Sequence, residues 1–454
     1  MKKLIYTLSL LWILASCTNE LDIDPQNTID AGTALTTEAG VQTALIGAYN
    51  DLQDSDVFGA NYNMISELLA ADAATEVEFS GTFASLADLY DKQHTKFNAE
   101  AAATWIDSYQ AINTANNVIA ALGVVSDDNR DSFDGQAKLI RALCYFELVR
   151  FFAKPYEAGQ ANSQAGVPLI LAPTTDASAI AKPSRATVAE VYARIIQDLQ
   201  EAETKLPATT AASARGLNFT RDVATAVLAK VYLQQGNFSG ARDLANTVIT
   251  NGNYSLVSDI ALAFNNSAAS SEDIFALRQT DQDNVQDNVA FYASTPGVGR
   301  GDMDIQTGHL GLYEATDDRL TKLFYTGTGT KAGRTRSGKW RTQFSWIPVI
   351  RLSEMYLIRA ETNQRLGSST GATPLADINA IRIRSNASAK TAVTLADILM
   401  ERRLELAWEG SRLHDIHRTQ ANVGTRPYND NFLILPIPNR EVLVNSNLTQ
   451  NDGF

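Results

Sequence analysis

Three glutamates recur at intervals of four residues near the C-terminal end of the chain, at Glu401, Glu405 and Glu409. Two carboxylates can hydrolyse a glycosidic bond when they face each other across it, about 5 to 9 Å apart. Glutamates four residues apart lie side by side on one helix face, so they cannot flank a sugar bond. Arginines nearby supply partners, namely Arg402, Arg403 and Arg412. The spacing therefore predicts an ion-pair network and not a catalytic pair.

Two further patterns with catalytic or metal-binding potential are incomplete. His414 and His417 could share a metal, but the chain has only 4 histidines, so we expect them to be packed in the core. Residues 333–339 resemble the start of a phosphate-binding loop. Trp340, however, stands where the Ser or Thr that binds Mg²⁺ should be. We expect a glycine-rich loop at that position.

Asp281, Asp283 and Asp287 suggest a calcium loop, but Val285 fills one ligand position and the expected glycine and bidentate glutamate are missing. No pattern in the chain is complete enough to be an active site. We therefore expect a protein that binds its target without transforming it, with no cofactor and no assigned metal.

The N-terminal residues predict export and lipid attachment. Two lysines and an apolar run over residues 4–14 are typical of a secretory signal, and the run is too short to span a membrane comfortably. Residues 14–17 read Leu-Ala-Ser-Cys, which resembles a bacterial lipobox in which Cys17 receives lipid. We expect a signal peptide over residues 1–16, a lipidated Cys17 and a polar tether over residues 17–28.

The net charge of the chain is −13. Such an acidic body lacks the basic patches that nucleic-acid phosphates require, and it is not suited to lie on an anionic lipid surface. We therefore expect no nucleic-acid partner and membrane attachment through the lipid alone. Once Cys17 is acylated, Cys144 has no disulfide partner, and its apolar surroundings predict a small buried residue.

The periodicity of apolar residues is helical. Val188, Val191, Tyr192, Ile195 and Leu199 form one stripe, and a Thr-x-x-Glu capping box precedes it. Residues 220–252 contain two helical segments separated by Gly-Asn, about the 34 residues of a tetratricopeptide unit.

Further apolar stripes predict an all-α protein whose helix pairs form a scaffold. Two stretches lack this regularity, at about residues 54–98 and 264–344, and long irregular stretches usually carry function. We expect a single domain over residues 29–454, with these two stretches as variable loop regions.

Several motifs resemble the SusD/RagB family of nutrient-binding surface lipoproteins. The C-terminal FLILPIPNRE (432–441) with LTQNDGF (448–454) is similar to the closing signature of the family. Similar motifs, in the family order, are the lipobox, residues 105–117 and 141–156, IRLSEMYLIRAE (350–361) and ERRLELAWEGSR (401–412). These are packing motifs, so the resemblance assigns no ligand residue.

The resemblance implies a helical body with four tetratricopeptide-like pairs and a variable ligand-binding part. It also implies a location at the bacterial outer membrane, facing the exterior. The implied partner is a SusC-like TonB-dependent transporter, which the protein would cover like a lid. The implied ligand is a glycan, with peptides as the alternative in the RagB branch.

Glycan binding requires aromatic rings for the C–H faces of sugars and planar polar groups for their hydroxyls. The two irregular stretches supply candidates of both kinds. We expect the aromatic platform to come from Phe79, Phe83, Tyr90, Phe291 and Tyr292, with at least two of them exposed in one patch. We expect the polar rim to come from Asp281, Asp283, Asn284, Asn288 and Arg300.

Overall fold

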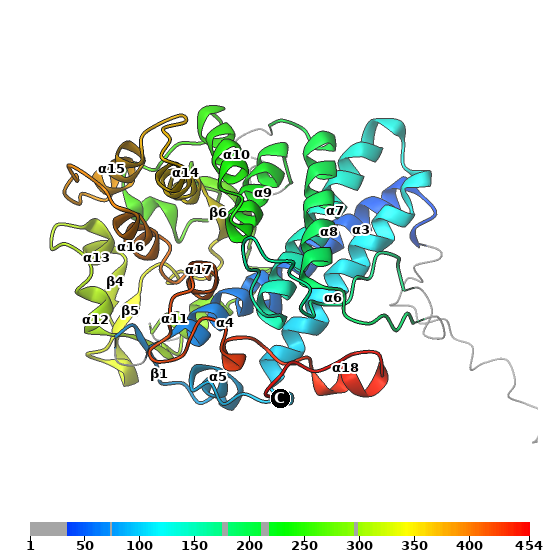
Figure 1. Ribbon diagram of the computed structural model, residues 1–454, viewed down its shortest axis with the longest axis horizontal. Helices are drawn as coiled ribbons and strands as arrows, with labels where there is room; N and C mark the ends of the chain where they lie inside the picture. The colour runs from blue at the N-terminus through cyan, green and yellow to red at the C-terminus, as the bar shows by residue number, and fades with distance from the viewer. Residues whose placement is uncertain (1–33, 73–74, 175–179, 210–217, 295–297) are drawn as a thin grey trace, which may run out of the picture.

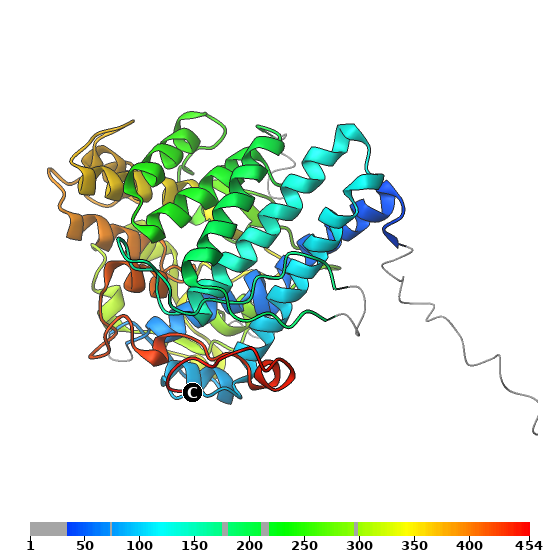
Figure 2. The same ribbon diagram turned by 45° about the vertical axis from the view of Figure 1, so that its right-hand side comes forward.

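The computed structural model describes residues 34–72, 75–174, 180–209, 218–294 and 298–454. Cys17, the expected signal peptide and the tether lie outside these residues. In the first half of the chain, four long helices run side by side (Figures 1 and 2). They are α3 (Glu38–Gln53), α6 (Ala99–Ala120), α7 (Asp127–Phe152) and α8 (Val188–Lys205).

The helix α7 is the centre of this bundle because nearly all of its C-terminal half is buried. Cys144 is fully buried in it, as predicted, and burial raises the pKa of the thiol well above its usual value. Arg141 of α7 donates to both carboxylate oxygens of Asp198 on α8 at 2.8 Å, and to Asn116 Oδ1 on α6 at 2.8 Å. One guanidinium group thus joins three helices.

Helix pairs continue through the rest of the chain (Figure 1). The predicted capping box of α8 is present between Thr187 and Glu190, and the turn between the two helices of the 220–252 unit is made by Gly236 with φ 76°. The remaining long helices are α9 (Arg221–Gln235), α10 (Phe238–Thr250), α14 (Leu352–Leu366), α15 (Pro374–Arg384), α16 (Leu395–Glu405) and α17 (Arg412–Thr419). The prediction of a mostly α-helical, tetratricopeptide-like scaffold is confirmed.

Short strands, which the sequence analysis did not foresee, organise the 264–344 stretch and link it to the N-terminal half. One antiparallel sheet has the order β1-β3-β5-β4, and Val77 of β1 pairs with Ile305 of β3. A second sheet pairs β2 with β6. The strands are β1 (Val77–Phe79), β2 (Asp273–Leu277), β3 (Met303–Ile305), β4 (Phe324–Thr326), β5 (Thr335–Ser337) and β6 (Ile347–Arg351).

The 54–98 stretch is also more ordered than expected. It contains the π-helical turn η1 (Ser55–Gly59), α4 (Asn61–Ala70) and α5 (Ala84–Tyr90). Every residue of α4 is buried. Polar residues such as Asn63, Ser66 and Glu67 are buried together with the apolar ones, so the residue types of α4 do not separate into a buried and an exposed face.

Short helices complete the described chain. They are η2 (Leu122–Val124), η5 (Ile260–Ala263), α11 (Asp287–Tyr292), α12 (Thr307–Leu310), α13 (Asp318–Lys322), η6 (Gly329–Lys331), η7 (Asn431–Leu433) and α18 (Asn439–Val444). Within the described residues, no helix is both long enough and apolar enough to span a membrane.

Candidate ligand-binding site

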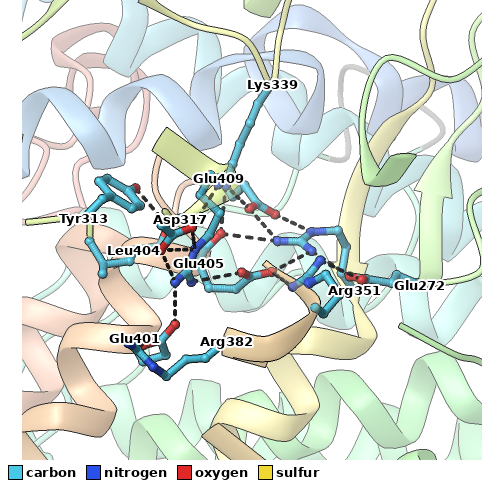
Figure 3. A network of polar contacts seen from close by, with 12 residues as sticks. Glu272, Tyr313, Asp317, Lys339, Arg351, Arg382, Glu401, Leu404, Glu405 and Glu409 are labelled. Atoms are coloured by element: carbon cyan, nitrogen blue, oxygen red, sulfur yellow. Dashed lines mark hydrogen bonds and ion pairs between the residues drawn. The ribbon is translucent and has the colours of Figure 1, made fainter. Parts of the chain in front are cut away.

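The glutamates of the C-terminal motif face the interior and form the predicted ion-pair network (Figure 3). Glu405 accepts hydrogen bonds from Arg351 at 3.1 Å and Arg384 at 2.6 Å, and Glu409 accepts from Arg351 at 2.7 Å. Glu401 lies 2.7 Å from the guanidinium of Arg319. We call this group, together with its further members Glu272, Asp317, Lys339 and Arg382, the Arg351 network.

The partners of these glutamates are not the arginines that the sequence suggested. Arg402 pairs instead with Glu354 at 2.9 Å and Asp415 at 2.8 Å, while Arg403 and Arg412 pair with Glu76. Residues adjacent on a helix point in different directions, so an arginine next to a glutamate meets other neighbours. The network therefore joins elements that are far apart in sequence.

The electrostatics of the Arg351 network do not suit acid catalysis. Burial alone would raise the pKa of Glu409, but Arg351 and Lys339 outweigh that effect and hold the pKa below its usual value. A carboxylate in that state is a poor proton donor. The Lys339 ammonium donates to Glu409 at 2.6 Å and the Trp340 indole to a backbone carbonyl, so neither side chain is available for phosphate.

The two histidines of α17 are packed in the core, as predicted. Burial lowers the pKa of His417 to about 3 and that of His414 well below its usual value. Both rings are therefore neutral at physiological pH. His414 Nε2 lies 3.7 Å from Glu147, too far for a hydrogen bond.

An exposed aromatic surface lies at the junction of the two loop regions. The rings of Phe83 and Phe291 meet edge to face with centroids 5.6 Å apart, and Phe83 is 42% exposed. The guanidinium of Arg300 lies 4.4 Å from the centroid of the Phe83 ring. We call Phe83, Phe291 and Arg300 the aromatic patch. It contains two of the five predicted platform residues and one of the predicted polar residues.

The position of Phe83 depends on the chain between β1 and α5. After β1, the Ser80 amide donates to the carbonyl of Asp302 at 2.7 Å, which continues the pairing with the β3 side. Gly81 then passes so close that a Cβ there would lie 2.5 Å from the Phe79 ring and 2.8 Å from the Asp302 carboxyl. The absence of a side chain at Gly81 thus lets the loop turn and present Phe83 at the start of α5.

The helix α11 separates its residues into an inner and an outer face. Tyr292 is fully buried, and Asn288 is buried with its amide donating to the Gly59 carbonyl at 2.8 Å. Phe291 lies on the outer side and is half-buried. The helix phase therefore points Tyr292 and Asn288 toward the interior and away from the aromatic patch.

Two other predicted aromatic residues form a separate pair beneath the surface. Phe79 is buried in β1, and its ring centroid lies 6.4 Å from that of half-buried Tyr90. Burial raises the pKa of Tyr90 to about 12. Phe79 supports the loop that carries Phe83, so it stabilises the aromatic patch without being part of it.

The predicted polar residues of the 281–284 segment lie in a loop before α11. Asp281 and Asp283 are exposed, and Asn284 is half-buried. The Asn284 amide donates to the Thr280 carbonyl at 2.8 Å, and the Thr280 amide donates to the Asp283 carbonyl at 2.8 Å. These hydrogen bonds shape their own loop and do not connect it to the aromatic patch.

Carboxylates also gather around η1. Oxygen atoms of Asp54, Asp56 and Asp107 lie within 4.8 Å of one another. Burial, and next the charge of Asp107, raises the pKa of Asp56 to about 7. The Asn61 amide donates to Asp56 at 2.7 Å. Protonation and this donor relieve the repulsion, and nothing else at the cluster indicates a cation, so we assign none.

A groove of about 710 Å³ lies where α6 and α18 meet residues 168–174 and 180–183. Trp105 and Tyr109 line it, and their ring centroids lie 4.9 Å apart with the ring planes tilted by 44°. The Tyr109 hydroxyl donates to the Pro168 carbonyl at 2.7 Å, and exposed Val444 of α18 also lines the groove. The sequence motif over residues 105–117 indicated packing and gave no sign of this groove.

Comparisons with known proteins agree with the helical scaffold. One family model, described as starch-binding associating with outer membrane, matches residues 21–233, and the model of the SusD family matches residues 222–434. The SusD-like protein P2 of Formosa agariphila is 27% identical, over 98% of this chain and 97% of that protein.

Solved structures agree as well. A putative sugar binding protein from Bacteroides vulgatus has 25% identity and a TM-score of 0.80, covering 93% of this chain and 99% of that one. A laminarin binding SusD-like protein has 23% identity and a TM-score of 0.77, covering 92% of this chain and 100% of that one, and shows the same fold. The two family models overlap at residues 222–233 and together span residues 21–434, and with the SusD-like relative they show that the chain belongs to the SusD/RagB family.

Proposed function

We propose that this protein is a non-catalytic, glycan-binding lipoprotein of the outer membrane that delivers its ligand to a SusC-like TonB-dependent transporter. The observation that supports glycan binding is the aromatic patch, where exposed Phe83 contacts Phe291 beneath the guanidinium of Arg300. An exposed ring accepts the apolar face of a sugar, and a guanidinium group donates to its oxygen atoms. The other aromatic candidates are buried or half-buried.

The family supports the cellular part of the proposal. One matching family model is described as associating with the outer membrane, and the laminarin binding relative has the same fold. Lipid attachment at Cys17, an exterior location and the transporter partner remain parts of the proposal. Mass spectrometry of the protein from membranes, with Cys17→Ala as the control, tests the attachment.

Calorimetric titration with neutral and acidic oligosaccharides tests the binding function. The Phe83→Ala change should weaken glycan binding about tenfold, because one stacking contact of about 1.4 kcal/mol is lost. Phe97→Ala is the matched control: Phe97 is also exposed, and the Lys96 ammonium lies 5.5 Å from its ring centroid. We expect this control to bind as the unchanged protein does.

A second control separates the aromatic patch from the groove. Val444→Asp places a charge in the groove lined by Trp105 and Tyr109. If this change abolishes binding and Phe83→Ala does not, the ligand lies in the groove and our assignment is wrong. Binding of peptides from a protein digest, with no glycan bound, would support the peptide-binding alternative.

A further inference from the structure

The aromatic patch adjoins a group of positive charges that is unusual for so acidic a chain. Arg300, Lys331, Arg334 and Arg336 lie around β3 and β5, although the net charge of the whole chain is −13. We call these four residues the basic cluster. Arg300 belongs both to this cluster and to the aromatic patch, so the two are continuous.

Two carboxylates hold the basic cluster together. Asp302 accepts from Arg300 at 2.9 Å and lies 4.0 Å from the Lys331 ammonium. Asp304 pairs with both Arg334 and Arg336. Exposed Glu78 of β1 is in register with Asp304 and contributes a third carboxylate. Four cations thus face three carboxylates.

Arg336, the innermost member of the basic cluster, has hydrogen-bond donors that its surroundings leave unpaired. Arg336 is fully buried, and its Nε and Nη2 atoms have no hydrogen-bond partner within the described part of the chain. Burial, and next the charge of Arg334, lowers the pKa of Arg336 to about 10. Burial also lowers the pKa of Lys331, where Arg336 and Arg300 oppose the effect of Asp302. An added anion would relieve this repulsion.

Two outer members of the cluster are accessible to a ligand. The side chains of Arg300 and Arg334 are 42% and 47% exposed. Arg300 donates through Nε to Asp302 and through one Nη to the Thr82 hydroxyl at 3.0 Å, so donors remain on the guanidinium. A guanidinium group binds carboxylate and sulfate oxygens through parallel hydrogen bonds.

We infer that the glycan bound at the aromatic patch is anionic, and that Arg300, supported by Lys331 and Arg334, binds its carboxylate or sulfate groups. This inference rests on the proposed glycan-binding function and specifies the chemical class of the ligand. It also excludes exposed Asp281 and Asp283 from the contacts, because they would repel such a ligand.

Calorimetric titration with three oligosaccharides of equal length tests the inference. Oligogalacturonate carries carboxylates, carrageenan fragments carry sulfates, and laminarin fragments are neutral. One of the two anionic ligands should bind about tenfold more tightly than the neutral one, since a charge-assisted hydrogen bond adds about 1.5 kcal/mol or more. This preference should decrease as salt is raised. The anionic oligosaccharide that binds more tightly shows whether the recognised group is a carboxylate or a sulfate.

Two variants assign the effect to Arg300. Arg300→Gln should weaken anionic binding about tenfold and neutral binding much less, because glutamine still donates hydrogen bonds to sugar oxygens but carries no charge. Its matched control is Arg426→Gln: the Arg426 side chain is 38% exposed, pairs with Asp430 and lies 5.7 Å from the Phe432 ring centroid. Asp302→Asn should tighten anionic binding because it releases Arg300, a gain that a misfolded variant would not show.

The outcomes separate the inference from the proposed function. If the neutral ligand binds at least as well as both anionic ligands and Phe83→Ala still weakens it, glycan binding stands and the anionic preference is wrong. If Arg300→Gln weakens neutral and anionic binding equally, Arg300 acts as a general donor and the inference is likewise wrong. Binding to none of the three glycans contradicts both.

Discussion

The Arg351 network and the basic cluster both bring arginines together with carboxylates, but the two differ in charge balance and exposure. In the interior, the network joins five cations, Arg319, Lys339, Arg351, Arg382 and Arg384, to five carboxylates, Glu272, Asp317, Glu401, Glu405 and Glu409. All of these residues except Arg384 and Glu409 are buried, and the side chains of those two are only 4% and 11% exposed. At its edge, the network's Arg382 also pairs with exposed Glu314. The basic cluster has more cations than carboxylates and is partly exposed.

This difference follows from the surroundings of each group. An unpaired charge in the interior costs several kcal/mol, so a buried group must be balanced. Near water an unpaired charge costs little free energy, so an excess of positive charge can persist where Arg300 and Arg334 are exposed. A balanced interior network therefore fixes the scaffold, whereas the unbalanced surface cluster keeps charge available for a ligand.

The largest effect is expected from breaking the network at its centre. Arg351→Met removes the cation shared by Glu272, Glu405 and Glu409. It should lower the free energy of unfolding by about 3–5 kcal/mol, because buried carboxylates lose their partner. Urea denaturation followed by circular dichroism measures the change. A loss no larger than that of Arg426→Gln, about 0–1 kcal/mol, would show that the network is dispensable.

Glu67 contrasts with the glutamates of the Arg351 network, because it is buried without a close cation. Its ionised form should therefore destabilise the protein. Burial, and next the charge of Glu76, raises the pKa of Glu67 to about 8, and the Gly410 amide donates to its carboxyl at 3.1 Å. The stability from protonated Glu67 is complete below the unfolded-state pKa of about 4.3 and is lost as pH rises through about 8.

Glu67→Gln stays neutral at every pH and keeps an acceptor for the Gly410 amide. It should match the unchanged protein near pH 4 and exceed it by up to about 5 kcal/mol near pH 9, measured by denaturation across pH. Glu361→Gln is the contrasting control, because Arg418 at 2.6 Å outweighs burial and lowers the pKa of Glu361. It should be destabilising at neutral pH. A stability difference between Glu67→Gln and the unchanged protein that stays the same at every pH would contradict the raised pKa.

The smallest effect on stability is expected at the basic cluster. Arg300→Gln should change the free energy of unfolding by about 0–1 kcal/mol, because its ion pair with Asp302 is partly exposed to water. The same variant should change anionic binding about tenfold. A stability loss similar to that of Arg351→Met would mean that Arg300 belongs to the scaffold and not to the binding surface.

The sequence predicted the scaffold where helices have one apolar face. The stripe of α8 and the Gly-Asn turn between α9 and α10 were both recognisable and are confirmed. The three-residue strands were not, because β1 pairs only with β3, more than two hundred positions away, as Val77 does with Ile305. Such pairing leaves no local pattern.

The candidate site was predictable in residue type but not in exposure. Phe291 and Tyr292 are adjacent and chemically similar, yet one is half-buried and the other fully buried. The phase of α11 decides between them, and so short a helix gives no reliable period in sequence. Lys331, Arg334 and Arg336 were not among the candidates because their link to Arg300 passes through Asp302 and Asp304.

The reactivity of Cys144 can report on opening of the helical bundle without an introduced cysteine. Cys144 of α7 is fully buried, and the other cysteine of the chain is Cys17. A thiolate must form and be accessible before an alkylating reagent can react. Modification of Cys144 therefore requires α7 to separate from its neighbours, and its rate under native conditions reports how often the helical bundle opens.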